Sequence, residues 1–228
     1  MKWSAFFTSS IGKKFTMALT GLFLISFLIV HVGLNACIWA NDGGSMFNRA
    51  AHFMGSTIVV RLMEVVLFIG FIIHIIQGWI LEVQNRKTRK KGYAVTLGNR
   101  GSKWYSRSMG LLGTLLFLFL VMHISHFWIP SRITHDLPPV EYRQVEMHNL
   151  YQRIIEVFQD PIVVILYVLG CISLGYHLLH GFKSAFRTLG IHNQRYFSLI
   201  KGTGYGFSII IAIAFAMMPI SVYLGWIK

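Results

Sequence analysis

The sequence predicts an all-α membrane protein whose five transmembrane helices pack as one bundle, a single domain over residues 1–228. Two observations predict this fold class. Hydrophobic residues make up 54% of the chain and charged residues only 13%, a balance typical of proteins that lie in a bilayer. Five apolar runs are also long enough, at about 1.5 Å per residue, to cross a hydrocarbon core of about 30 Å.

The predicted helices run from about 15 to 39, 57 to 83, 109 to 129, 161 to 182 and 205 to 227. The first has no small-residue cleavage site, so we expect a membrane helix and not a signal peptide. The second and third have Trp79 and Trp128 near an end, where tryptophan favours the membrane–water interface. The fourth opens with Pro161, which suits the first turn of a helix, and the fifth closes near Trp226.

Lysine and arginine are concentrated in three segments. The N-terminus, the Gln84–Met109 loop and the Lys183–Gly204 loop hold 15 of the 21, whereas the remaining loops and ends hold seven of the eight acidic residues. Basic residues flank spans on the cytoplasmic side. We therefore expect a bacterial cytoplasmic membrane protein with the N-terminus inside and the C-terminus outside.

Composition also disfavours several function classes. The net charge is +13, but the basic residues are concentrated in loops beside the apolar runs. This distribution is typical of orientation signals and membrane-surface contacts, so no nucleic-acid partner is expected. Cys37 and Cys171 lie inside apolar runs without a C-x-x-C pair. They support neither a disulfide framework, nor a thiolate zinc site, nor covalently attached haem.

Histidine recurs inside four of the five apolar runs, where a polar ring costs free energy unless something satisfies it. These residues are His31, His74, His123, His126, His177 and His180. His31 lies 17 residues beyond Lys14, about 25 Å from the inner end of its helix. His123 lies 16 residues beyond Arg107, at almost the same height. His74 and His177 lie about 9–12 Å from the inner side, so two histidines share an outer level and two an inner level.

Four glycines stand at matching offsets from these histidines. Gly21 and Gly113 precede the outer pair by ten residues, and Gly78 and Gly181 follow the inner pair by four. Ten residues correspond to about 15 Å along a helix, so Gly21 and Gly113 lie at the inner level and leave room there for something flat. Close helix packing explains each glycine singly but not the matched offsets. The offsets select His123 over His126, and likewise His177 over His180.

Two facing imidazoles at each of two depths are the axial ligands that two stacked haem b groups need in a helical bundle. The second ring nitrogen of each histidine can then donate to a helix carbonyl. Three other interpretations stay open, namely hydrogen-bonded packing residues, a zinc site and a proton relay. Zinc favours closer clusters with Cys or carboxylate ligands, which the inner level does not offer.

Other polar residues near the spans are candidates for supporting roles. Arg61 and Glu64, with His52 just before their helix, are a candidate quinone or propionate site, because a quinone head needs hydrogen-bond donors and a proton acceptor. A local ion pair is the plainer alternative. Candidate inner propionate contacts are Trp104, Arg107, Lys183 and Arg187. For His126 and His180, propionate contact and simple packing both stay open.

Five segments carry a family resemblance. They are MALTGLFLISFLIVHVGLN, FNRAAHFM, RLMEVVLFIGFIIHIIQG, GLLGTLLFLFLVMHISHFW and GYHLLHGFKSAFRTLG. From about Ser10 to its end, the chain resembles the single-polypeptide, di-haem cytochrome b subunit of succinate dehydrogenase and fumarate reductase, the succinate:quinone oxidoreductases.

The resemblance implies an anchor that holds a flavoprotein subunit and an iron–sulfur subunit against the cytoplasmic face. It implies that His74 and His177 ligate the proximal haem. His31 and His123 would ligate the distal haem, with menaquinone reacting nearby on the outer side. Electrons would pass from succinate through flavin and iron–sulfur centres to both haems and the quinone, linking the tricarboxylic acid cycle to the respiratory chain, or back toward fumarate. The dicarboxylate site would lie on another subunit, so no catalytic residue is expected here.

One position departs from the family pattern. Some fumarate-reducing relatives carry a carboxylate two residues before the ligand on the fourth helix, where this chain has Gly175. We therefore expect the succinate-oxidising direction. Two other functions stay open, a cytochrome b anchor of a hydrogenase or formate dehydrogenase and, from another class, a histidine-lined transporter or proton channel. Co-purified subunits distinguish the first, and the absence of a b-type absorption band would favour the second.

Overall fold

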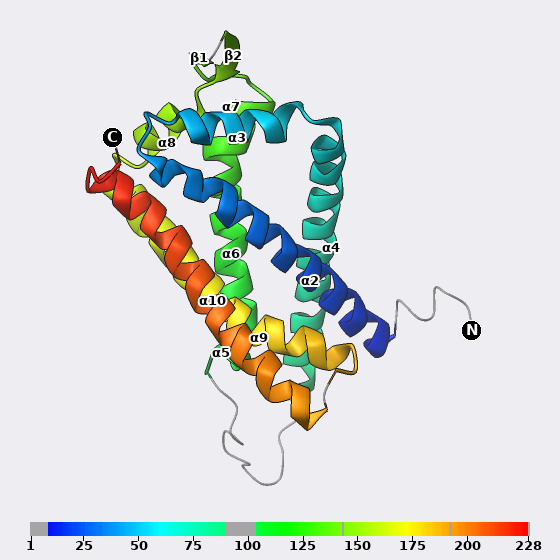
Figure 1. Ribbon diagram of the computed structural model, residues 1–228. Helices are drawn as coiled ribbons and strands as arrows, with labels where there is room; N and C mark the ends of the chain where they lie inside the picture. The colour runs from blue at the N-terminus through cyan, green and yellow to red at the C-terminus, as the bar shows by residue number, and fades with distance from the viewer. Residues whose placement is uncertain (1–8, 90–103, 143, 192, 228) are drawn as a thin grey trace.

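The computed structural model describes residues 9–89, 104–142, 144–191 and 193–227, most of them helical (Figure 1). Within this part of the chain, five helices are long and apolar enough to cross a membrane. This confirms the predicted number of spans and indicates a multi-pass membrane protein. The spans are α2 (Ser10–Ala36), α4 (Ile58–Arg89), α6 (Met109–His123) with its continuation to Arg132, α9 (Pro161–Thr188) and α10 (Gln194–Tyr223).

Several helices extend further than the apolar runs that predicted them. α4 and α9 each continue six residues past their predicted ends at 83 and 182, and α10 begins eleven residues before 205 and ends at Tyr223, short of 227. Hydropathy marks only the part of a helix that lies in oil, whereas backbone hydrogen bonding continues into the polar turns. The predicted Lys183–Gly204 loop is therefore largely helical. Residues 90–103 of the predicted Gln84–Met109 loop lie outside the described residues.

Short polar side chains begin three of the spans. Ser9 before α2, Asp160 before α9 and Asn193 before α10 each accept a hydrogen bond, at 2.8–3.0 Å, from a backbone amide two or three residues further on. Such caps satisfy amides that the first helical turn leaves unpaired. After α9, Gly190 has a φ of +84°, a conformation that favours glycine and ends the helix before the chain turns into α10.

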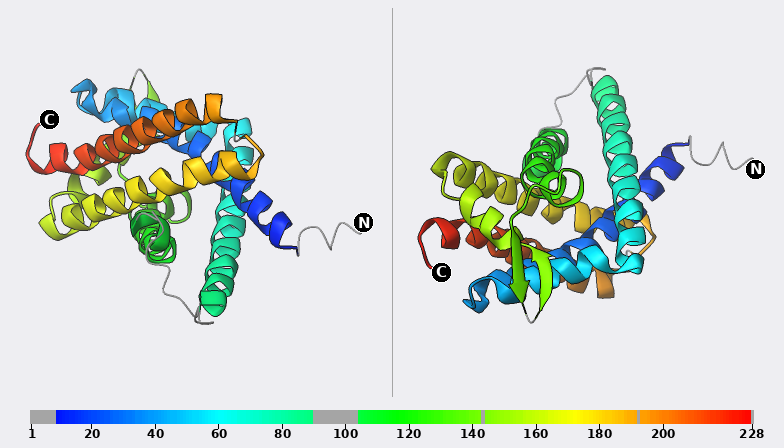
Figure 2. Two further views of the ribbon diagram at one scale, coloured as in Figure 1. Left: turned by 90° about the horizontal axis from the view of Figure 1, so that it is seen from below. Right: turned by 90° about the horizontal axis from the view of Figure 1, so that it is seen from above.

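The spans are arranged around α9 and α2. α9 and α10 form an antiparallel helical hairpin, α6 packs on α9, and α2 contacts α4, α9 and α10. Figure 2 shows α4 standing apart from the α9–α10 hairpin, with α2 connecting the two. Gly170 permits the close approach of α6 to α9, because a Cβ atom there would overlap the ring of Phe119.

One end of the bundle, which we name the cap end, is covered by short elements (Figure 1). They are η1 (Cys37–Ala40), α3 (Ser45–Ser56), α7 (Ile129–Arg132), the antiparallel strands β1 (Pro139–Tyr142) and β2 (Val145–His148), and α8 (Leu150–Val157). These short elements lie outside the five predicted spans, and neither α3 nor the hairpin was predicted. The opposite end, which we name the basic end, carries the starts of α2 and α10, the ends of α4 and α9, and α5 (Trp104–Arg107).

Asn48 of α3 fastens the cap end together and is fully buried. Its Nδ2 donates to Oδ1 of Asn149 at 3.0 Å and to the hydroxyl of Tyr142 at 3.3 Å, and its Oδ1 accepts from the Tyr151 amide at 2.9 Å. A buried amide needs such partners to offset its desolvation. Beside it lies the main apolar cluster, which includes Phe47, Ile154, Phe158, Tyr167, Met218 and Val222. The side-chain core is thus concentrated at the cap end.

Candidate functional site

Four histidine rings from four different spans form two pairs inside the bundle. Nearer the cap end, His31 of α2 faces His123 of α6, with ring centroids 5.8 Å apart and ring planes at 90°. Nearer the basic end, His74 of α4 faces His177 of α9, with centroids 6.3 Å apart and planes at 63°. These are the pairs that the depth calculation predicts. We name them the cap-side pair and the basic-side pair.

The spacing within each pair suits two ligands of one metal ion. Because an imidazole nitrogen binds a first-row metal at about 2 Å and lies about 1 Å from its ring centre, two imidazoles on opposite sides of one ion have centroids about 6 Å apart. Both pairs have this spacing. Among the described residues, no three His, Cys, Asp or Glu side chains gather around a common metal position. A metal at either pair would therefore need further ligands, such as the four nitrogens that a porphyrin would supply.

The surroundings of the Nδ1 atom separate the four histidines into two groups that differ from the two pairs. Nδ1 of His74 lies 3.0 Å from the hydroxyl of Thr20, and Nδ1 of His31 lies 3.3 Å from Nδ2 of Asn35. By contrast, the Nδ1 atoms of His123 and His177 are buried and have no hydrogen-bond partner among the described residues. A buried polar atom without a partner costs free energy, and such atoms are few in folded proteins. Both members of this second group come from the second half of the chain.

Two of the predicted glycines lie against the basic-side pair. A Cβ atom on Gly21 would lie 3.5 Å from Cε1 of His74, and one on Gly113 would lie 3.9 Å from Cε1 of His177. Both glycines stand ten residues before a histidine of the cap-side pair, so the two levels are about 15 Å apart along the helices. Gly78 faces Met17, and a Cβ on Gly181 would meet nothing within 4 Å. The structure thus places Gly21 and Gly113, but neither Gly78 nor Gly181, beside a histidine ring.

Gly175 contributes to helix packing. A Cβ atom on this residue would lie 3.0 Å from Cβ of Ala212 on α10, which is closer than nearly all real contacts of that kind. The carboxylate that some relatives of the resembled family carry here would have to displace α10. The close α9–α10 contact gives a physical reason for glycine at this position.

A π-helical segment, η2 (Ile124–Trp128), follows His123 and changes the register of the third span. Such widened turns occur frequently at functional sites. Within it, Nδ1 of His126 lies 3.1 Å from the hydroxyl of Tyr167, and Arg153 Nε donates to the His126 carbonyl at 3.1 Å. Sequence reasoning missed Tyr167, which packs against both His123 and His126. His126 is therefore held in a polar pair beside the cap-side pair.

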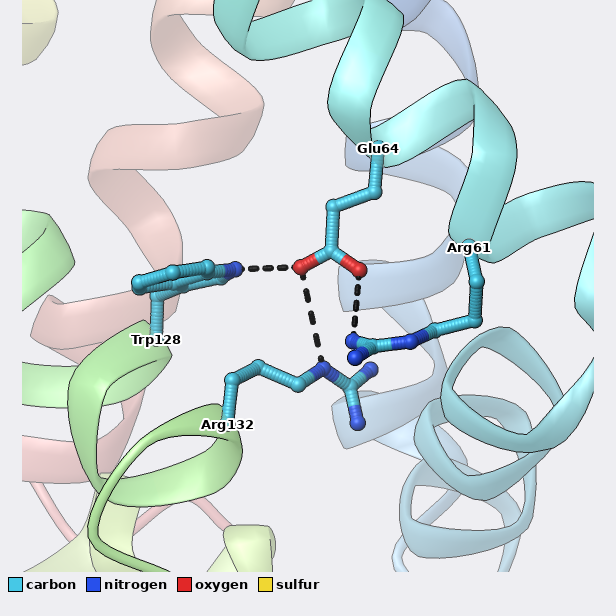
Figure 3. A network of polar contacts seen from close by, with 4 residues as sticks. All are labelled: Arg61, Glu64, Trp128 and Arg132. Atoms are coloured by element: carbon cyan, nitrogen blue, oxygen red, sulfur yellow. Dashed lines mark hydrogen bonds and ion pairs between the residues drawn. The ribbon is translucent and has the colours of Figure 1, made fainter.

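Glu64 is the centre of a polar network near the cap end (Figure 3). Its Oε2 lies 2.7 Å from a guanidinium nitrogen of Arg61, and its Oε1 lies 3.8 Å from Nε of Arg132 and accepts a hydrogen bond from the Trp128 indole. Arg132 and Trp128 join α4 to the end of the third span, and neither was predicted here. His52 lies on α3 and, among the described contacts, makes no hydrogen bond to Arg61 or Glu64.

The candidates at the basic end do not form one cluster. Trp104 packs edge-on against Tyr176, the neighbour of His177, with centroids 5.6 Å apart. Lys183 lies with its Nζ 5.2 Å from the centroid of the Phe197 ring, and Arg187 is exposed. Trp104 therefore contacts the residue next to His177 in the sequence.

Comparison of the chain with protein families, with curated proteins and with solved structures found no match.

Proposed function

We propose that this chain is the membrane-anchor cytochrome b subunit of a succinate:menaquinone oxidoreductase. In this proposal the cap-side pair, His31 and His123, holds one haem b, and the basic-side pair holds a second. When bound, the two haems supply one-electron carriers across the membrane. The observation that carries the proposal is the spacing of the paired imidazoles, 5.8 and 6.3 Å, at two levels of one bundle.

The surrounding residues support this assignment by their packing. Each pair bridges two helices, α2 with α6 and α4 with α9, so one ion at each level would cross-link the bundle. Phe27 stacks on His31 with centroids 5.0 Å apart, and Phe119 stacks on His123 at 5.8 Å. The two phenylalanine rings restrict rotation of the imidazoles on which they stack, and they keep water away from the nitrogens that would bind the iron.

The distribution of charge supports the proposed orientation and partners. Basic side chains at the basic end include Lys13, Lys14, Arg86, Lys183 and Lys201. In the proposal this end lies in the cytoplasm and binds the iron–sulfur and flavoprotein subunits, while the cap end faces outward. In the proposal, succinate is oxidised on the flavoprotein subunit, and quinone that enters from the membrane is reduced at this chain.

Haem quantification tests the proposed function directly. The purified full-length chain is expected to contain two non-covalently bound protohaems per polypeptide, measured as pyridine haemochrome, and to show a b-type absorption band after reduction with dithionite. A chain expressed with haem available that contains none would favour the transporter interpretation. A content of one would contradict the assignment of one of the two pairs.

The network around Glu64 is proposed to receive the quinone head. It supplies donors from two guanidinium groups and an indole, together with a carboxylate that can accept a proton. We expect Glu64→Gln to slow reoxidation of the dithionite-reduced chain by menadione at least tenfold, measured by stopped-flow absorbance, with haem content unchanged.

Glu82 provides the matched control for this variant. It lies on the same helix and pairs with Arg86 at 2.6 Å, but at the basic end. Glu82→Gln is expected to reoxidise at the unmodified rate. Equal slowing in both variants, or in neither, would contradict a quinone site at Glu64.

A further inference from the structure

Thr20 of α2 makes a contact that distinguishes His74 from the other three paired histidines. Its Oγ1 lies 3.0 Å from Nδ1 of His74, across the interface between α2 and α4. The same oxygen lies 2.8 Å from the carbonyl of Thr16 and 3.3 Å from that of Met17, one turn earlier on α2. The hydroxyl therefore has three partners and a single proton.

The position of that proton follows from the geometry. The carbonyl oxygens of Thr16 and Met17 can only accept, so the Thr20 hydroxyl donates to them, as threonine commonly does within a helix. The Thr20 oxygen is then left as an acceptor toward His74. The contact with Thr16 is the shorter one, at 2.8 Å, so we assign the hydroxyl proton to it; Nδ1 of His74 then carries a proton and donates it to Thr20. In a neutral imidazole this leaves Nε2 with a free lone pair, which is the form that binds a metal.

None of the other paired histidines has an equivalent contact in the described part of the chain. Nδ1 of His123 and Nδ1 of His177 have no partner there. His31 differs in direction: Nδ2 of Asn35 donates to the His31 carbonyl at 2.7 Å and lies 3.3 Å from Nδ1, so this nitrogen faces a donor and does not donate as Nδ1 of His74 does. The hydroxyl contact thus makes the basic-side pair chemically asymmetric, although the pairs look alike in the sequence.

We propose that Thr20 is the positioning residue of the basic-side site, which holds His74 in its metal-binding tautomer and makes it the more electron-rich ligand of its pair. The inference rests on the proposed function, because it concerns haem at His74. A histidine that donates from its second nitrogen is a stronger base and stabilises the oxidised metal. Thr20 is therefore expected to lower the reduction potential of the haem at this pair relative to that of the same haem without the hydrogen bond.

The test is a spectroscopic redox titration of the purified full-length chain carrying Thr20→Val, which keeps the shape of the side chain and removes the hydroxyl. We expect the equilibrium constant for reduction of one haem component to rise by up to about tenfold, a shift of about 59 mV for one electron, while the other component stays in place. Thr20→Ser keeps the hydroxyl and is expected to restore the unmodified titration.

Thr16→Val is the matched control. The Thr16 hydroxyl donates to the Gly12 carbonyl at 3.0 Å, one turn before Thr20, and the substitution leaves intact the backbone carbonyl that Thr20 uses. We expect it to change neither component. If Thr20→Val retains two haems and both titrate as before, or if Thr16→Val shifts the same component equally, the role of Thr20 is wrong and the proposed function stands. If the unmodified chain binds no haem, both fail.

Discussion

Replacing His74 or His177 with alanine is expected to reduce the haem content of the purified chain from two per polypeptide to one. Each substitution removes one of the two imidazoles that face each other 6.3 Å apart, and a methyl group cannot replace an axial ligand. The cap-side pair is carried by α2 and α6 at a level about 15 Å away, so its haem should be retained. Pyridine haemochrome quantification and the dithionite-reduced spectrum measure the loss.

The chain contains matched controls for these substitutions. His180 lies one turn from His177 on the same helix, and His126 lies one turn from His123. Alanine at either control position also removes an intramembrane imidazole, but we expect two haems to remain. If His74→Ala and His177→Ala remove different haem components, the two histidines do not share one iron. If His180→Ala, and not His177→Ala, removes a haem, the ligand on α9 has been assigned to the wrong residue.

The spans and the histidine pairing could be predicted from the sequence because both depend on regular helix geometry. A rise of 1.5 Å per residue converts the positions of His31, His74, His123 and His177 into depths. The same arithmetic places Gly21 at the level of His74, and the structure has the two in near contact. Periodicity along one helix is local information, and it is therefore readable from a single chain.

The cap end and the contacts between helices could not be predicted in this way. Each hairpin strand has only four residues, too few for a strong periodic signal, and α3 is a short helix of mixed polarity that a search for long apolar runs does not detect. Two of the three partners of Glu64, Trp128 and Arg132, lie 64 and 68 residues away along the chain, and Tyr167 meets His126 across 41 residues. Such pairings depend on how helices rotate against one another, which hydropathy does not determine.

Thr20 illustrates the same difference at the level of one atom. A threonine in an apolar run ordinarily bonds to its own helix, and nothing in the local sequence indicates a second partner. Its contact with His74 joins two helices across 54 residues. The repeat of glycine and histidine offsets suggests two equivalent halves, whereas the nitrogen partners in the structure make the halves unequal.

Gly21→Leu is expected to cause the selective loss of the haem at the basic-side pair. An added Cβ would lie 3.5 Å from Cε1 of His74, which is ordinary van der Waals contact, so alanine should be tolerated with nearly full haem content. Leucine adds three further carbons in a region already packed against the imidazole ring. It must either rotate His74 away from His177 or occupy the space beside the ring that a flat ligand needs.

The control for this substitution is Gly33→Leu on the same helix, because a Cβ there would meet nothing within 4 Å. We expect Gly33→Leu to keep two haems, Gly21→Ala to keep nearly two, and Gly21→Leu to fall toward one. The component that remains in Gly21→Leu should have the reduced spectrum of His74→Ala, because both variants disable the same pair. A remaining spectrum that instead matched His31→Ala would mean that Gly21 serves the histidine ten residues after it on α2. We infer that α2 and α6 each carry a histidine of the cap-side pair and a glycine that makes room at the basic-side pair. That result would contradict this inference.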